Sequence, residues 1–128
     1  MKINSITSEI IRAALLVHSA LGPGLLESVY QTCLTHLLRQ NGLSVETERP
    51  MPVSFNGIRF DVGLRLDLLV EEQVIVEVKA IRRLLPVHSA QLLSYMRLSD
   101  KRVGLLLNFH VRHMRHGIQR LVNGYDES

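Results

Sequence analysis

Residues 64–79 read LRLDLLVEEQVIVEVK. Two short runs rich in branched apolar residues flank a polar turn, which is the pattern of two antiparallel strands. A turn of three residues pairs Val70 with Val74. The same register sets Asp67 opposite Glu77, and directly paired side chains point to one side of a sheet with Cβ atoms roughly 4.5–5.5 Å apart. The stretch therefore predicts a hairpin that brings two carboxylates together.

The two carboxylates need a compensating cation if they are buried. Side chains alternate along a strand, so Ile75, Glu77 and Lys79 share one face. The strands are apolar at nearly every other position, which predicts cover on both sides and makes an uncompensated carboxylate pair costly. A metal site is the favoured interpretation. The alternative is a solvated face with a weak ion pair, and a register slip of one residue would separate the two carboxylates.

Length and composition predict one compact domain, residues 1–128. An apolar content of 46% excludes disorder of the whole chain. The apolar runs are too short to span a membrane, and the N-terminus lacks the pattern of a signal peptide. The single cysteine, Cys33, is expected to be a buried small hydrophobe in a reducing compartment. We therefore expect a cytoplasmic protein that does not bind membranes.

Charge is distributed unevenly along the chain. Residues 1–78 carry six Lys/Arg and nine Asp/Glu, whereas residues 79–120 carry nine Lys/Arg and one acid, a balance of +8. A basic segment that begins at the proposed metal site is typical of a surface that contacts a phosphate backbone. An arginine-rich soluble surface is the alternative. The residues predicted to contact nucleic acid are Arg82, Arg83, Lys101, Arg102, Arg112 and Arg115.

Helical spacing of apolar residues predicts two helices before the sheet. The first has Ser5 or Thr7 as its N-cap and buries Ile10, Ala13, Ala14, Val17 and Leu21. The second runs from about 25 to 40 and buries Leu26, Val29, Cys33 and Leu37.

The rest of the chain predicts strands around one further helix. Asn56-Gly57 suits a type I′ turn between strands at 52–55 and 58–61. A helix is expected from about 87 to 99, then a strand at 103–109 that pairs in parallel, then a basic stretch that could form a short helix to Val122. The predicted fold is α/β (α+β), a central mixed sheet flanked by helices in the order ααβββ(β)αβ(α).

Other residues could carry chemistry, and each also has a structural explanation. Glu27 lies near a helix N-terminus, where the dipole stabilises an anion, and Tyr30 follows one turn later. His88, Gln91 and Tyr95 form a polar stripe on one helix face. The three histidines within 110–116 are spaced too widely around a helix to converge easily on zinc, so contact with phosphates is favoured there.

These residues resemble the PD-(D/E)XK nuclease superfamily, which has the restriction-endonuclease-like fold. Asp67 with Glu77-x-Lys79 is similar to the superfamily core, and Gly24-x-x-Glu27-x-x-Tyr30 is similar to the signature of its GxxExxY branch. The likeness extends through the blocks QLLSY, residues 91–95, and GLLLNF, residues 104–109. Asp/Glu-x-Lys alone is weak evidence, whereas four blocks in the right order are strong evidence.

The resemblance implies a role for each matching residue. Asp67 and Glu77 would bind the metal, with the backbone carbonyl of Val78 as a further candidate ligand. Lys79 would act on the reacting water. The secondary catalytic residues would be Glu27, Gln91 and Tyr95. The proline that leads the family motif is replaced by Leu66, at a position that varies widely across the superfamily.

The sequence therefore predicts a nuclease. All-oxygen, carboxylate-dominated sites suit Mg²⁺ or Mn²⁺, which can activate water for attack on phosphorus. DNA is favoured over RNA as the substrate, and a homodimer that pairs two sites stays open. A non-catalytic nucleic-acid-binding module and a structural protein that binds an acidic partner are the alternatives.

Overall fold

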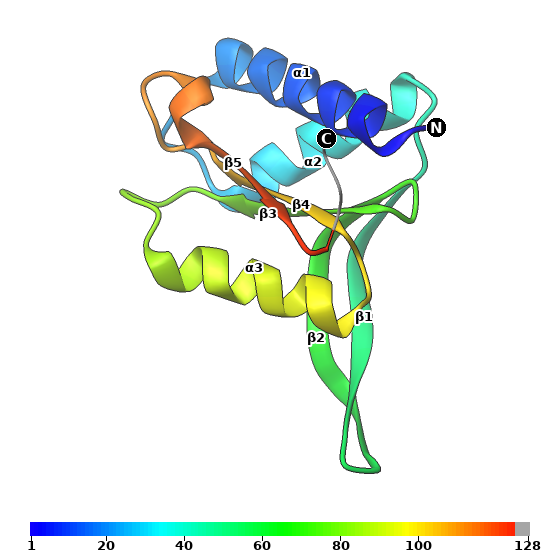
Figure 1. Ribbon diagram of the computed structural model, residues 1–128. Helices are drawn as coiled ribbons and strands as arrows, with labels where there is room; N and C mark the ends of the chain where they lie inside the picture. Colours follow the sequence, from blue (N-terminus) through cyan, green and yellow to red (C-terminus); the bar gives the residue numbers. More distant parts are fainter. Residues whose placement is uncertain (125–128) are drawn as a thin grey trace.

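The computed structural model describes residues 1–124, with Val62 and Gly63 described by their backbone alone. Within that range, five strands form one mixed sheet in the order β1-β2-β3-β4-β5 (Figure 1). The strands are β1 (Val45–Phe55), β2 (Ile58–Val70), β3 (Val74–Lys79), β4 (Val103–Asn108) and β5 (Ile118–Val122). The end of the predicted domain, 125–128, lies outside the described residues.

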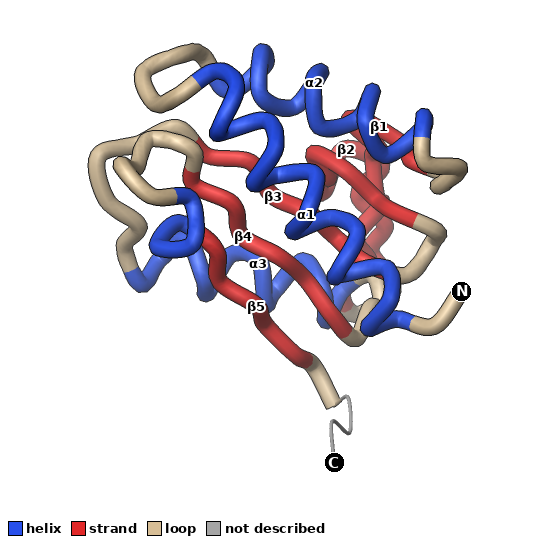
Figure 2. Tube along the Cα trace, turned by 90° about the horizontal axis from the view of Figure 1, so that it is seen from above, coloured by secondary structure: helices blue, strands red, loops and turns tan. Residues whose placement is uncertain are grey.

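Helices cover both faces of the sheet, as the predicted fold class requires. The helices are α1 (Ile3–Leu21), α2 (Glu27–Gln40) and α3 (Pro86–Leu98). Helices α1 and α2 lie on one face and α3 lies on the other, as the two views together show (Figures 1 and 2). Helix α3 connects β3 to β4, and these two strands are parallel, whereas the other neighbouring pairs are antiparallel. This is the crossover predicted for the strand at 103–109.

Strand β3 has cover on both sides, which decides where its polar residues point. Val76 and Val78 pack in the core beneath α1 and α2, and Ile75 packs in the second core beneath α3. Because side chains alternate along a strand, Glu77 and Lys79 share the α3 face with Ile75. The expectation of cover on both sides is therefore confirmed for this strand.

The Asn-Gly hairpin is confirmed, but it is longer than predicted. Asn56 and Gly57 have φ of 48° and 80°, as a type I′ turn needs. The two strands predicted at 58–61 and 64–70 are one continuous strand, β2, because pairing with β1 resumes after a register shift between Met51 and Val53. The β1–β2 ribbon extends beyond the helices (Figure 1).

The prediction of which face α2 buries was only partly right, since Cys33 and Leu37 pack half-buried against the core but Leu26 and Val29 are exposed. The buried residues are Tyr30, Leu34, Thr35 and Leu38, whereas the side chain of Leu26 is 74% exposed. Two apolar stripes run along this helix one residue apart, and periodicity alone does not separate them. The stripe that contains Tyr30 is the buried one, because the hydroxyl of this residue is hydrogen-bonded inside the protein. It donates to the carbonyl of Gly22 (2.6 Å) and accepts from the N–H of Leu25 (3.0 Å).

Both predictions at the ends of the chain also need correction. Helix α1 begins at Ile3, before the predicted caps, and its N-cap residue Lys2 makes no side-chain capping bond. The closing stretch is a 3₁₀ turn, η1 (Met114–Gly117), followed by strand β5 rather than a helix. Strand β5 pairs with β4 and satisfies backbone groups that would otherwise lie unpaired at the sheet edge.

Gly117 packs directly on the backbone of β4, so adding a methyl group there should be costly. A Cβ at this position would meet the carbonyl group of Asn108, whereas a Cβ at Gly104 would meet mainly the flexible thioether of Met96. We expect Gly117→Ala to lower the free energy of unfolding by about 2–3 kcal/mol, and Gly104→Ala to cost less, because backbone moves less easily than a side-chain tip. Urea denaturation of both variants measures this. A smaller loss for Gly117→Ala than for Gly104→Ala would contradict it.

Candidate active site

Strands β2 and β3 separate where Asp67 faces Glu77. The predicted register is confirmed, since Val70 pairs with Val74 and the ladder continues to Leu68 and Val76. Beyond that pair, hydrogen bonds between side-chain carboxylates and backbone N–H groups replace the backbone hydrogen bonds between the two strands. The Asp67 carboxylate accepts from the Val78 N–H (2.9 Å), and the Glu77 carboxylate accepts from the Asp67 N–H (3.4 Å). Each carboxylate is therefore held by the backbone of the opposite strand.

Burial makes the negative charge of Glu77 costly. This side chain is only 7% exposed. The pKa of Glu77 is raised to about 9, first by burial and next by the charge of Asp67, while the positive charge of Lys79 acts in the opposite direction. Without a cation, the Glu77 carboxyl therefore favours its protonated form. A cation between the two carboxylates would remove that cost, and the all-oxygen donor set suits Mg²⁺ or Mn²⁺.

Lys79 ends β3 on the same side as Glu77, close enough for its charge to affect the pKa of that carboxyl. Its backbone is held by the residue that follows β4: the Lys79 carbonyl accepts from the Phe109 N–H (2.9 Å). Asn108, 2% exposed, continues the attachment through its side chain. The Asn108 amide accepts from the Ile81 N–H (3.1 Å) and donates to the Ile81 carbonyl (3.0 Å). Asn108, to which we assigned no role from the sequence, therefore anchors the chain that leaves Lys79.

Helix α3 contributes Tyr95 to the site, with Gln91 beside it. The pKa of Tyr95 is raised, first by burial and then by the charge of Glu77, with a smaller contribution from Asp67. The hydroxyl thus lies near both carboxylates. Gln91, one turn earlier, donates to this hydroxyl (2.9 Å). His88 does not join them, because its Nδ1 accepts from the Leu85 N–H (2.9 Å) and caps the helix. The predicted stripe therefore divides into a cap and a site pair.

Glu27 lies exposed on one face of α2, at the first residue of the helix, and its role in the candidate site stays a prediction. Gln31 follows one turn later on that face. The Gln31 amide donates to the Asp67 carbonyl (3.4 Å) and to the carboxylate of Glu48 (3.0 Å). The structure thus brings the Glu27 face of α2 to Asp67 through Gln31. Sequence reasoning missed Gln31, although its spacing of four residues from Glu27 was an available signal.

Tyr30 and Gly24, the other two residues of the motif that contains Glu27, contribute to the structure of the chain around it. Tyr30 is fully buried and stacks on Phe109, with ring centroids 4.5 Å apart and planes at 8°. Its hydroxyl holds the loop between α1 and α2, in which Gly24 has φ of 100°. A residue other than glycine is strained at that φ. Tyr30 and Gly24 therefore shape the loop before Glu27.

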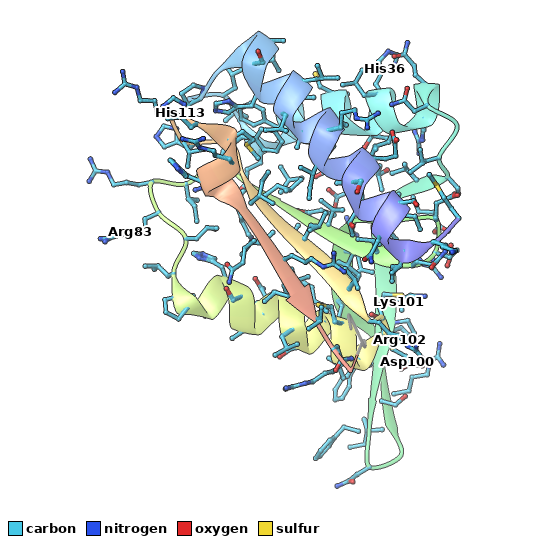
Figure 3. All side chains as sticks on the ribbon, turned by 45° about the horizontal axis from the view of Figure 1, so that its top comes forward. His36, Arg83, Asp100, Lys101, Arg102 and His113 are labelled. Atoms are coloured by element: carbon cyan, nitrogen blue, oxygen red, sulfur yellow. The ribbon has the colours of Figure 1, made fainter. Side chains whose placement is uncertain are left out.

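The predicted phosphate-binding residues divide into two groups along β4. Arg82 and Arg83 follow Lys79, and Arg112 and Arg115 follow the carboxyl end of β4, whereas Lys101 and Arg102 precede its other end. Figure 3 shows Arg83 and His113 on one side of the molecule and Lys101 and Arg102 on the other. Of the histidines, His113 and His116 meet edge to face, and within residues 1–124 no three side chains of His, Cys, Asp or Glu are grouped to hold a metal.

A carboxylate pair and a lysine on a mixed sheet, covered by helices on both faces, define a restriction-endonuclease-like protein. The chain belongs to the PD-(D/E)XK nuclease superfamily, whose family model matches residues 4–121. Nucleases of this superfamily generally use divalent metals.

Comparison with solved structures supports the same fold. The crystal structure of SSO0001 is similar with a TM-score of 0.59 and 21% sequence identity, over 97% of this chain. The match covers 61% of SSO0001, so this chain spans less than two thirds of that protein. A search among curated proteins found no match. Within the described residues, no helix has the length and apolarity needed to cross a membrane.

Proposed function

We propose that this protein is a nuclease that depends on Mg²⁺ or Mn²⁺ and hydrolyses phosphodiester bonds of nucleic acid. The observation that carries the proposal is the half-buried Asp67 opposite the buried Glu77, with Lys79 on the same face of the sheet as Glu77. Burial without a cation leaves Glu77 with a pKa of about 9. A site built at such a cost suggests a function rather than a contribution to stability.

The residues present fit a divalent ion. Asp67 and Glu77 would hold it, with the Val78 carbonyl as a further candidate ligand and Glu27 as a secondary group. When bound, such an ion lowers the pKa of a water molecule and offsets charge on the phosphoryl group. Asp67 keeps its orientation through its bond from the Val78 N–H (2.9 Å).

The chain's own residues supply orientation and charge. Lys79 is suited to orient the attacking water and to share the negative charge that develops on the phosphate oxygens. The Tyr95 hydroxyl accepts from Gln91 (2.9 Å) and keeps its proton, since its pKa is raised. It can therefore donate a hydrogen bond toward the carboxylates or toward a phosphate oxygen beside them. Gln91 positions that hydroxyl.

Several finer assignments belong to the same proposal. The chain fits the GxxExxY branch through Gly24, Glu27 and Tyr30, as a single nuclease domain. DNA is the proposed substrate class, and a cytoplasmic location is expected. A homodimer is the alternative to a monomer. Each of these extends beyond the membership of the superfamily.

A cleavage assay tests the proposed function. Wild type is incubated with single-stranded, duplex and branched DNA and RNA, with Mg²⁺, with Mn²⁺ or with EDTA. We expect cleavage of at least one substrate only when metal is present, and a loss of about a hundredfold or more in Asp67→Asn. The asparagine keeps an oxygen that can accept from the Val78 N–H, so the substitution removes charge rather than shape.

Two results would contradict the proposal. One is no cleavage of any substrate under either metal, in which case binding without products would favour the non-catalytic module. The other is undiminished cleavage by Asp67→Asn. Thermal unfolding of the variant, compared with that of wild type, controls for a loss of structure.

A further inference from the structure

One cleft of the molecule, here called the Gly22 cleft, lies between the loop after α1 and the loop before η1. It has a volume of about 630 Å³, and its lining includes Ser19, Gly22, Pro23, Arg112, His113 and Arg115. The arginine and histidine side chains in that set are exposed. The described residues that line the cleft include no acidic side chain. Its electrostatic potential is therefore positive, which favours an anionic ligand.

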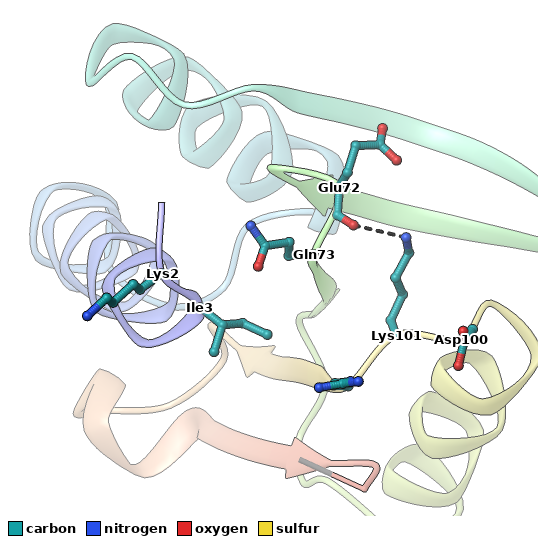
Figure 4. Close-up of a pocket in the computed structure, with 7 residues that line it drawn as sticks. Lys2, Ile3, Glu72, Gln73, Asp100 and Lys101 are labelled. Atoms are coloured by element: carbon teal, nitrogen blue, oxygen red, sulfur yellow. Dashed lines mark hydrogen bonds between the residues drawn. The ribbon is translucent and has the colours of Figure 1, made fainter. Parts of the chain in front are cut away.

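A second pocket at the opposite end of β4 differs in charge. It has a volume of about 490 Å³, and the acidic residues Glu72 and Asp100 lie in its wall beside Lys101 and Arg102. The Lys101 ammonium donates to the Glu72 carbonyl (2.9 Å), as Figure 4 shows. Cations and carboxylates partly cancel in this pocket. The basic segment of the sequence therefore yields one strongly cationic cleft and one of mixed charge.

The Gly22 cleft is joined to the candidate active site through Tyr30. The Tyr30 hydroxyl donates to the carbonyl of Gly22 (2.6 Å), and its ring stacks on Phe109. The Phe109 N–H in turn donates to the Lys79 carbonyl (2.9 Å). A cleft wall and the lysine strand are thus connected through Tyr30 and Phe109, which places the cleft at the Lys79 end of the sheet.

The two basic loops at this end are also tied to each other. The side-chain oxygen of Asn108 accepts from the N–H of Ile81 (3.1 Å) and from that of His110 (3.2 Å). Ile81 directly precedes Arg82 and Arg83, and His110 opens the loop that leads to the cleft. Exposed arginines of both loops therefore lie at the end of the sheet that carries the carboxylates.

We propose that the Gly22 cleft binds backbone phosphates of the nucleic acid at the Lys79 end of the sheet, through Arg112 and Arg115. Arg82 and Arg83 extend this surface toward the carboxylate pair. Lys101 and Arg102 lie outside it, which divides the six residues first predicted to contact nucleic acid. This inference rests on the proposed function, since it assumes a nucleic-acid ligand.

Binding of a fluorescent DNA oligonucleotide, single-stranded or duplex, tests the proposal when measured by anisotropy in EDTA over a range of salt. Two double variants remove the same charge: Arg112→Gln with Arg115→Gln, and Lys101→Gln with Arg102→Gln. We expect the first pair to weaken binding and to reduce the slope of log K against log salt by about 2, because each phosphate contact contributes about one unit. The second pair should leave the slope as in wild type.

The outcomes separate this inference from the proposed function. Equal slopes in the two double variants, or a greater loss at Lys101 and Arg102, would overturn the inference even if wild type cleaves DNA. Absence of wild-type binding at low salt would overturn it as well and would favour an acidic protein partner. The expected slopes without any cleavage would support the cleft and refute the nuclease. Circular dichroism melting of each variant checks that it is folded.

Discussion

Replacing Lys79 with methionine is expected to lower the rate of cleavage by about a hundred- to a thousandfold, the effect typical of losing one preorganised donor to a transition-state oxyanion. Methionine keeps an unbranched side chain of similar length, so packing at the end of β3 should be preserved. The Phe109 N–H bonds the backbone carbonyl of Lys79 (2.9 Å), which the substitution leaves in place. Single-turnover cleavage with saturating enzyme measures the rate.

A matched control is available in the same sheet. Lys101→Met makes the same chemical change at the other end of β4, away from the carboxylates, and should cleave at close to the wild-type rate. In Lys79→Met, the affinity for the oligonucleotide, measured in EDTA, should fall far less than the rate of cleavage. The role of Lys79 would be refuted if that variant cleaves within a few-fold of wild type, or if the Lys101 variant loses as much.

Replacing Glu77 with glutamine should abolish cleavage and yet stabilise the metal-free protein. The pKa of Glu77 is about 9 in the folded protein, against an ordinary 4.5. Between these values the unfolded chain releases a proton that the folded chain keeps, so stability falls as pH rises from about 4.5 to about 9. Above the upper value both states are ionised and the penalty is constant.

Glutamine removes that penalty and keeps the shape. At pH 7 the gain should be on the order of 3–4 kcal/mol, since pH 7 lies about 2.5 units above 4.5 and one pKa unit corresponds to about 1.4 kcal/mol. The difference from wild type should shrink toward zero near pH 4.5. Urea denaturation across this pH range in EDTA measures both quantities. A variant that is less stable than wild type at pH 8 would contradict the proposed burial of charge.

Wild type and Glu77→Gln can also be compared to measure metal binding. Adding Mg²⁺ should raise the melting temperature of wild type, because a ligand that binds only the folded state stabilises it. It should raise that of Glu77→Gln little, since the variant lacks one of the two carboxylates. Equal shifts in both proteins would place the metal elsewhere. Comparing the two shifts in melting temperature tests metal binding at Glu77 without requiring a known substrate.

The hairpin at the centre of the site was predictable because its information is local. Turn length and alternation set the pairing of Val70 with Val74, and in that register the Glu77 carboxylate accepts from the Asp67 N–H on the opposite strand. The cover on both sides of β3 followed from its apolar composition. By contrast, the face of α2 was predicted only in part, because two apolar stripes lie side by side and the hydrogen bonds of Tyr30 favour the one that contains it.

The sequence by itself thus determined the fold class, the crossover through α3, and a lysine beside two carboxylates on one strand face. Tertiary structure alone decided that Gln31 and Asn108 support the site, through hydrogen bonds between segments 36 and 27 residues apart. It also divided the basic segment, because the parallel pairing of β3 and β4 puts Arg112 and Arg115 at the Lys79 end and Lys101 and Arg102 at the other. A count of basic residues along the sequence does not show at which end of the sheet each one lies, whereas the direction in which β4 runs does.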